Sequence, residues 1–180
     1  MKVVGMTSLL IPAVAALEQE CFANPWSPEG IEESFNNPAY YFFVCRNDDG
    51  EPVGYISYYQ VRDEAFINNV AVTESARRQG VGRALVQRAE QSARDNGAAF
   101  LSLEVRRSND PAIELYESQD FEVEGVRRKY YRDPEEDAFL MTKRFTPEFD
   151  VGLGSCGRGI GDPFGAGCGV TIIPEESAKE

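Results

Sequence analysis

One segment has the residue types and the position of an anion-binding loop. It reads Arg77-Arg78-Gln79-Gly80-Val81-Gly82-Arg83 and lies between an apolar strand pattern and the amphipathic pattern of a helix. Glycines let backbone N–H groups approach an anion closely, and a helix start adds unpaired donors and the positive end of its dipole. The segment is neither a Walker loop nor a Gly-x-Gly-x-x-Gly dinucleotide site. The pattern alone is equally typical of pyrophosphate binding and of an ordinary strand-to-helix turn.

A carboxylate follows near the end of the next strand pattern. Glu104 alternates with Leu103 and Val105, so its side chain points away from the apolar face of that strand. Ligands of α/β sheets usually bind at the carboxyl ends of strands, which makes Glu104 a candidate base. The alternative is a solvated charge paired with Arg106, and the spacing alone favours this alternative.

Two polar side chains accompany the helix that comes next. Tyr116 lies four residues after Ala112, a spacing that favours a core aromatic. Asp110 is the expected helix cap, followed by Pro111 at the first helical position. Asn109 is then either a second cap or a ligand contact.

The chain contains no histidine, which excludes several kinds of active site. Ser-His-Asp triads, Cys-His pairs, His-x-Glu zinc deaminases and His-Glu-x-x-His metalloproteases all need an imidazole. The four cysteines, Cys21, Cys45, Cys156 and Cys168, show no Cys-x-x-Cys spacing, so we expect free thiols and no metal site. A reducing cytoplasm disfavours a disulfide between Cys156 and Cys168.

The charge and hydropathy of the chain limit its partners. Thirty acidic against eighteen basic residues give a formal net charge of -12, which argues against nucleic acid and favours basic peptides or amines, although acidity more often serves solubility. The longest mostly apolar run, residues 9–17, is about half a bilayer span and contains Pro12; the start of the chain also lacks the pattern of a secretory leader. We therefore expect a cytoplasmic protein with no membrane partner.

The periodicity predicts alternating helices and strands up to residue 145. A hairpin over 40–46 and 53–61 extends to a third strand at 65–72, and a helix over 81–94 crosses to a parallel strand at 100–105. Further helices are expected at 12–22, from Pro28 to the 36–38 cluster and at 110–118, with a closing antiparallel pair at 121–131 and 138–144. Residues 1–145 are thus predicted to form one domain, and 146–180 a Gly-rich, flexible or loosely docked tail.

Several ordered motifs together resemble the GNAT acetyltransferases. The opening matches through Glu18-Gln19 and Asn24-Pro25-Trp26-Ser27, so the resemblance covers roughly residues 8–144. Within this superfamily the chain is similar to the ribosomal protein alanine N-acetyltransferases. The other matching motifs are Asn69-Val70-Ala71-Val72, Arg78 to Arg83, Leu103 to Asn109, Leu115-Tyr116-Glu117-Ser118, and Arg127 to Tyr131 followed by Glu136-Asp137-Ala138.

The resemblance implies an α/β (α+β) GNAT fold: a mixed, mostly antiparallel sheet, helices on both faces and a central strand-helix-strand unit that binds acetyl-CoA. It implies that two strands separate between Val72 and Glu104 to admit the thioester and an amine. It further implies that Glu104 is the general base and Tyr116 the general acid. The implied cofactor contacts are Val70, Ala71 and Val72 for pantetheine, Arg78, Gln79, Gly80, Val81, Gly82 and Arg83 for pyrophosphate, and Asn109.

The implied acceptor is the N-terminal amine of a ribosomal protein, the eighteenth of the small subunit. An α-amino group loses its proton near pH ~8, against about 10.4 for lysine, so a carboxylate suffices as base without histidine. The alternatives are a lysine or small-amine acetyltransferase and a noncatalytic acyl-CoA-binding module.

The conformation of one residue and the orientation of two others depend on the folded structure. The family usually has glycine where this chain has Asp120; because aspartate tolerates left-handed geometry, we expect the turn before Phe121 to survive. Asn68 and Asn69 place two amides beside the predicted cofactor-binding strand, and the sequence leaves open whether both face the slot.

Overall fold

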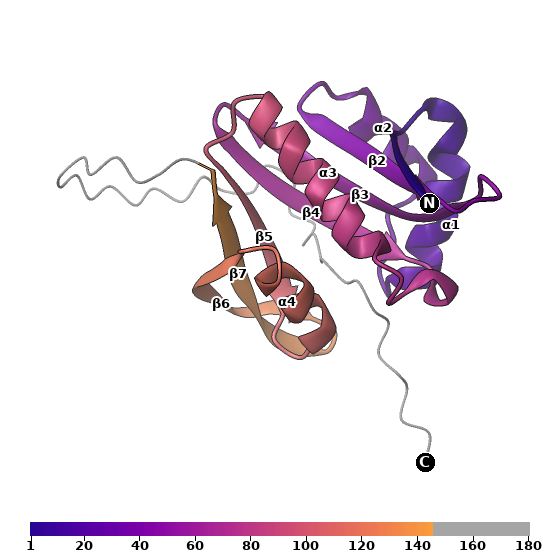
Figure 1. Ribbon diagram of the computed structural model, residues 1–180. Coiled ribbons are helices and arrows are strands. Elements are labelled where there is room, and N and C mark those ends of the chain that lie inside the picture. The colour runs from indigo at the N-terminus through magenta and orange to yellow at the C-terminus, as the bar shows by residue number, and fades with distance from the viewer. Residues whose placement is uncertain (146–180) are drawn as a thin grey trace, which may run out of the picture.

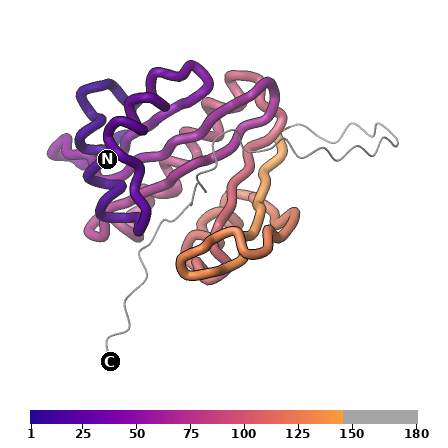
Figure 2. The backbone as a smooth tube through the Cα atoms, turned by 180° about the vertical axis from the view of Figure 1, so that it is seen from behind, coloured from indigo at the N-terminus to yellow at the C-terminus, as the bar shows by residue number. Residues whose placement is uncertain are grey.

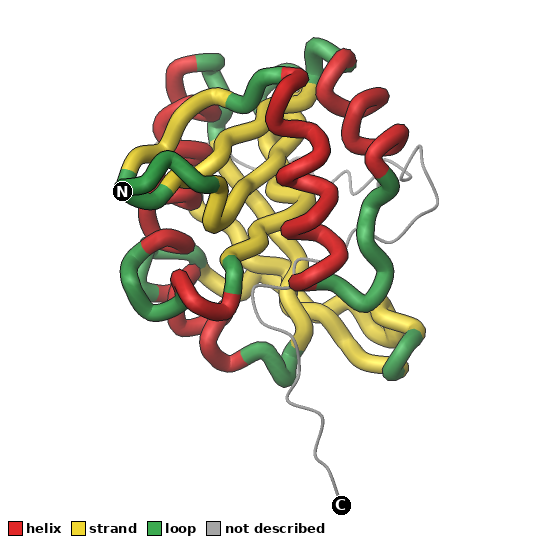
Figure 3. The backbone as a smooth tube through the Cα atoms, turned by 90° about the vertical axis from the view of Figure 1, so that its right-hand side faces the viewer, coloured by secondary structure: helices red, strands yellow, loops and turns green. Residues whose placement is uncertain are grey.

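The computed structural model describes residues 1–145, which contain a seven-stranded sheet with helices on both faces (Figures 1 and 3). The predicted Gly-rich segment, with Cys156 and Cys168, lies outside the described residues. The strands are β1 (Lys2–Gly5), β2 (Tyr40–Arg46), β3 (Pro52–Val61), β4 (Glu64–Val72), β5 (Phe100–Arg106), β6 (Glu122–Arg132) and β7 (Glu135–Arg144). The helices are α1 (Ile11–Cys21), α2 (Pro28–Asn36), α3 (Val81–Asp95) and α4 (Asp110–Glu117), with short 3₁₀ turns at Ser8–Leu10 and Glu74–Ala76.

The strand order confirms the predicted mixed sheet. It runs β1-β2-β3-β4-β5-β7-β6, and β4–β5 is the parallel pair that the strand-helix-strand prediction requires. The other five neighbouring pairs are antiparallel. The edge strand β1 was not predicted, because Lys2–Gly5 has two β-branched residues and ends in glycine; its pairing with β2 makes it a strand.

Each face of the sheet has its own apolar core. On one face, called the α3 face, α3 and α4 pack over β4 and β5, with Leu85, Val86 and Tyr116 fully buried. On the other, called the α1 face, α1 and α2 pack over Phe42, Val44, Tyr55 and Ala71. The predicted amphipathic face of α3 is confirmed, since Val81, Leu85, Val86, Ala89 and Ala93 are all buried, together with Ser92.

Two of the four described helices, α2 and α4, begin at a side-chain cap. The Ser27 Oγ accepts from the Gly30 N–H at 3.1 Å, as expected of the cap before Pro28. The predicted cap at Asp110 is wrong. Asn109 is the N-cap of α4, because its Oδ1 accepts from the Ala112 N–H at 3.3 Å, and Asp110 is already in the first helical turn.

The turn at Asp120 has the predicted left-handed geometry. Its φ is 64°, and Phe121 directly after it is buried against Tyr116, with ring centroids 5.7 Å apart. Aspartate thus occupies the position at which the family usually has glycine, and the core contact that follows the turn is kept.

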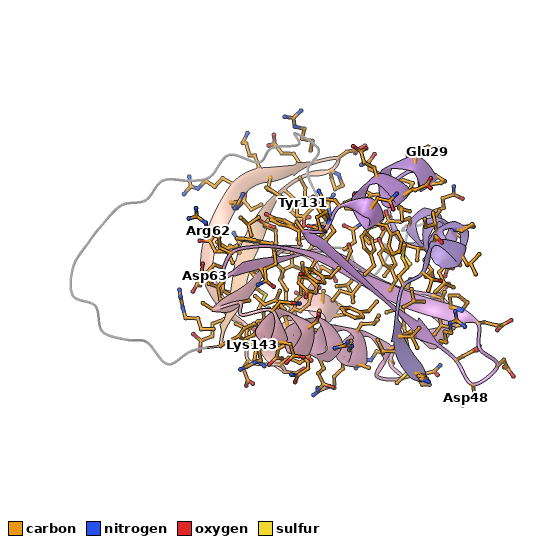
Figure 4. The ribbon with its side chains drawn as sticks, turned by 90° about the horizontal axis from the view of Figure 1, so that it is seen from above. Glu29, Asp48, Arg62, Asp63, Tyr131 and Lys143 are labelled. Carbon is orange, nitrogen blue, oxygen red and sulfur yellow. The ribbon has the colours of Figure 1, made fainter. Side chains whose placement is uncertain are left out.

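One arm of the molecule diverges from the rest of the sheet (Figures 1 and 2). It consists of β5, β7, β6 and α4. Lys143 of β7 lies beside α3 (Figure 4), where its Nζ is 2.9 Å from the Glu90 Oε2. This ion pair joins the base of the arm to the helix. The divergence creates the gap in which the candidate site lies.

Candidate active site

β4 and β5 pair for only three residues before they separate. The parallel register runs from Glu64↔Phe100 to Phe66↔Ser102 and stops there. Beyond that point β4 continues on β3 as far as Val72, and β5 continues on β7 as far as Arg106. The predicted separation of these two strands, between Val72 and Glu104, is therefore present.

A β-bulge lies where the two strands part. Asn69 pairs with Ser57 and Ile67 with Tyr58, so Asn68 is the extra residue. The bulge inverts the side-chain alternation, because Ile67 and Val70 both belong to the core on the α3 face. Asn69 faces the α1 side, where it bonds a side chain of α1. Asn68 is also buried, and its Nδ2 has no hydrogen-bond partner among the described residues.

A cavity of about 560 Å³ opens on the α3 face, beside the end of β4. Of the predicted cofactor residues, Val72, Arg78, Gly80, Val81, Gly82 and Arg83 line it, together with the Pro111–Ser118 side of α4. Val70 and Ala71 are buried in β4, and the Gln79 Nε2 donates to the Ser75 carbonyl at 2.7 Å.

The backbone of the 77–83 loop is shaped for anion binding. Arg78 has φ 59° and Gly80, the N-cap of α3, has φ 85°. Left-handed residues next to a helix start turn successive N–H groups toward one side, which forms an anion-binding concavity. The Gly80 N-cap has no side-chain cap, so the first N–H groups of α3 are not capped by a side chain.

α3 and α4 approach each other closely along the cavity. A Cβ on Gly82 would lie 3.0 Å from the Leu115 Cδ2, and the Arg83 Nη2 donates to the Ser118 Oγ at 2.9 Å. The second glycine of the loop is therefore explained by helix packing as much as by anion binding.

Tyr116 is a core aromatic whose hydroxyl is unpaired. It is fully buried on the α3 face, and its hydroxyl has no hydrogen-bond partner among the described residues. Burial, with a smaller contribution from Tyr131, raises the pKa of Tyr116 well above its ordinary value. An unpaired buried hydroxyl costs about 1–3 kcal/mol, so a position in the core alone does not explain it.

Glu104 lies on the opposite side of β5 from Tyr116. Leu103 and Val105 belong to the core on the α3 face, and Glu104 alternates to the α1 face. Its side chain is 13% exposed, and its Oε1 is 3.2 Å from the Arg127 Nη2. Glu104 and the core that contains Tyr116 thus lie on opposite faces of β5.

Arg106, the alternative partner considered for Glu104, is paired instead with Glu136. Arg106 bonds Glu136 at 3.1 Å, donates to the carbonyls of Asp133 and Pro134, and lies with its Cζ 4.1 Å from the Tyr131 ring. Glu136 also accepts from the N–H of Ser108 at 2.7 Å. The β6–β7 hairpin folds over the end of β5 and supplies partners that spacing along one strand cannot reveal. Tyr131 lies inside the molecule, close to the middle of the view in Figure 4.

The sequence analysis missed a buried carboxylate on the α1 face. Glu18 of α1 is completely buried and accepts from the Trp26 N–H at 2.7 Å, from Asn69 Nδ2 at 2.7 Å and from the Tyr55 hydroxyl. Burial raises the pKa of Glu18, and these three hydrogen bonds act in the opposite direction. The signal was available: Glu18 lies four residues after Val14 and next to Leu17, on the apolar stripe of its helix.

The thiols and the acidic groups of the described part form no metal cluster. Within residues 1–145 no group of three or more His, Cys, Asp or Glu is placed to hold a metal ion. Cys21 and Cys45 are free and buried, and burial raises the pKa of Cys21 to about 11. No described helix is both long and apolar enough to cross a membrane.

The chain belongs to the GNAT acetyltransferase family. Residues 11–121, which contain the diverging strands, the 77–83 loop and Tyr116, match the acetyltransferase (GNAT) family.

Relatives within the family include N-terminal acetyltransferases. The chain is 38% identical over 133 residues to the ribosomal protein bS18-alanine N-acetyltransferase of Escherichia coli K12, covering 73% of this chain and 88% of that one. It is 32% identical over 135 residues to the N-alpha-acetyltransferase RimI of Mycobacterium tuberculosis, covering 72% and 83%. The crystal structure of the Escherichia coli ribosomal-protein-S18-alanine N-acetyltransferase superposes with a TM-score of 0.75 at 33% identity, covering 83% of this chain and 97% of that one.

Proposed function

We propose that this protein transfers the acetyl group of acetyl-CoA to the N-terminal amine of a ribosomal protein, in the cytoplasm. The observation that carries the proposal is the separation of β4 from β5. The cavity beside the start of α3 lies on one face of the sheet, and the Glu104 carboxylate lies on the other. The Escherichia coli relative is named for its action on ribosomal protein bS18, so the corresponding small-subunit protein is the proposed acceptor.

The cavity residues fit acetyl-CoA. Backbone N–H groups of the 77–83 loop and the first turn of α3 are suited to the pyrophosphate, and Arg78 and Arg83 supply positive charge at the cavity. The free edge of β4 from Val70 to Val72 is suited to the amides of the pantetheine arm, because β5 has left it. The cofactor supplies an acetyl group activated as a thioester. The Asn109 Oδ1 caps α4, and its Nδ2, which has no hydrogen-bond partner among the described residues, is the proposed contact with the cofactor.

Glu104 is the proposed base. It lies on the α1 face at the open end of β5, which we therefore call the acceptor side, and it takes the proton of the incoming ammonium directly or through water. Its partner Arg127 is 52% exposed, so an ammonium can replace that guanidinium beside the carboxylate with little loss.

Tyr116 is the proposed acid. Its unpaired hydroxyl lies on the α3 face, which also holds the cavity, and its raised pKa keeps it protonated through neutral pH. It donates that proton to the leaving thiolate. No side chain needs to become acylated, so catalysis depends on placing two bound substrates together.

Thiol release from acetyl-CoA tests the proposal, with the N-terminal peptide of the small-subunit protein as acceptor. We expect release with a peptide that starts with alanine, and no release with the same peptide blocked at its N-terminus. Mass spectrometry of the product should place one added acetyl group on the N-terminal alanine of the peptide. Faster release with lysine or small amines would support the alternative acetyltransferase. Tight acetyl-CoA binding without release for any amine would support a binding module.

A further inference from the structure

The buried Glu18 takes no part in the mechanism above, yet its environment is built around it. It lies on α1 with no solvent exposure, and both of its oxygens are used. Oε1 accepts from the Tyr55 hydroxyl and from Asn69 Nδ2, and Oε2 accepts from the Trp26 N–H. Asn69 Nδ2 also donates to the Tyr55 hydroxyl at 3.2 Å, which joins the three side chains in one network.

The three partners come from three different elements on the acceptor side. Tyr55 lies in β3, and Asn69 lies in β4 directly after the bulge, where β4 has just separated from β5. Trp26 lies in the loop between α1 and α2, and it packs against the core on the α1 face. Glu18 therefore ties this loop to the strand that borders the gap on the side opposite Glu104.

Packing alone does not account for a carboxylate here. An apolar side chain of similar size would fill the same space without the cost of burying a carboxylate, but it would leave three buried donors without an acceptor. What a carboxylate adds is the ability to accept from three donors in fixed directions. Its loss is therefore expected to release these partners from their positions as well as to lower the stability of the fold.

We propose that Glu18 is a positioning residue for the acceptor half of the site, which it acts on by holding the Trp26 loop and Asn69 in place. This inference rests on the proposed function, because it assumes that an amine enters on the α1 face. The cofactor cavity lies on the other face, and none of the three hydrogen-bond partners of Glu18 lines it.

The chain has a single tryptophan, so its fluorescence reports on this loop directly. In Glu18→Leu we expect the KM for the acceptor peptide to rise by about tenfold or more, since a displaced contact in an active site can cost that much. The KM for acetyl-CoA should stay within about twofold of wild type, and quenching of Trp26 by acrylamide should increase. Thermal stability should fall, because the Trp26 N–H, the Tyr55 hydroxyl and the Asn69 amide lose their acceptor.

Three further variants distinguish the effect of the Glu18 hydrogen bonds from the effect of the space that its side chain fills. Glu18→Gln keeps one oxygen that can accept from the Trp26 N–H. Its amide NH₂ can donate to the Tyr55 hydroxyl and to a reoriented Asn69 side chain. This variant should therefore recover much of the wild-type KM for the acceptor. Glu33→Leu makes the same change at an exposed glutamate of α2 and should leave all readouts unchanged. If Glu18→Leu fails to fold, Tyr55→Phe removes one donor and should raise the acceptor KM by about threefold.

Two results would overturn the inference: an unchanged acceptor KM together with unchanged Trp26 quenching, or equal increases in KM for both substrates. The two KM values are measured with whichever amine the wild type accepts. The comparison therefore still tests the role of Glu18 if the acceptor is not the N-terminus of a ribosomal protein. If the wild type acetylates no amine, the proposed function fails, and Trp26 quenching alone decides whether Glu18 holds the loop.

Discussion

The two faces of the strand gap are built in different ways. On the α3 face the cavity is formed largely by one continuous segment, residues 76–83, and its geometry is set by backbone angles such as φ 85° at Gly80. On the α1 face the contacts join side chains that are far apart in the sequence, such as Glu18 with Tyr55 and Asn69, which are 37 and 51 residues away. Side-chain changes should therefore affect the acceptor side most, and backbone changes the cofactor side.

The largest expected effect is on the acceptor side, at Glu104. Glu104→Gln should lower kcat by roughly 10³-fold, within the range for loss of a general base, and leave the Kd for acetyl-CoA within about twofold. Single-turnover kinetics and calorimetric binding measure the two quantities. Glu124→Gln, which removes an exposed partner of Arg144, is the matched control. A wild-type kcat in Glu104→Gln would show that Glu104 is not the base.

Tyr116→Phe should lower kcat by roughly 10²-fold, less than loss of the base, because a thiol with a pKa of about 8.5 is a good enough leaving group to depart as the thiolate without first being protonated. The free energy of unfolding should be unchanged or slightly higher, since the removed hydroxyl is buried without a partner. Urea denaturation of both proteins measures this. A kcat loss that is matched by a comparable loss of stability would indicate a packing role only.

Gly80→Ala tests the backbone origin of the cofactor side. An alanine forced to φ 85° costs about 1–2 kcal/mol, so the Kd for acetyl-CoA should rise by roughly tenfold while the acceptor KM changes little. Gln79→Ala is the neighbouring control, because that side chain is bonded to the Ser75 carbonyl and does not line the cavity. Similar losses in both variants would contradict a backbone-built site.

The smallest expected effect is on pH dependence at Glu136. Burial opposes the ionisation of Glu136, but hydrogen bonds from Ser108 and Arg106 outweigh it and lower its pKa. The stability this group contributes is thus present above pH ~4.3, and is lost as the pH falls through the lowered pKa. Glu136→Gln should lower Tm by about 2–4 °C at pH 7 and by less at pH 3.

Hydrogen exchange can locate that effect. Protection in the β6–β7 hairpin should fall in Glu136→Gln, while protection in α3 should not, because Glu136 joins the hairpin to Arg106 and Ser108 at the end of β5. Glu135→Gln removes an exposed pair with Lys129 and should leave Tm within about 1 °C of wild type at both pH values. A uniform loss of protection would contradict a local role.

The sequence by itself determined the features that depend on neighbouring residues. The alternation of apolar and polar residues predicted β2 to β5 and α3 to within one or two residues, and the glycine loop at the start of α3 was located by its position between them. The left-handed turn at Asp120 was predicted from residue type. These features are set by backbone sterics and periodicity, which act over a few residues.

Only the tertiary structure decided which distant side chains meet. It gave Glu104 the partner Arg127 and gave Arg106 the partner Glu136, it made β1 a strand by pairing it with β2, and it buried Glu18 against Tyr55 and Asn69. A buried charge or an ion pair takes its energy from groups brought close by the fold, whatever their separation along the chain. That is the physical reason why the loop of the cofactor side could be recognised in advance and the contacts of the acceptor side could not.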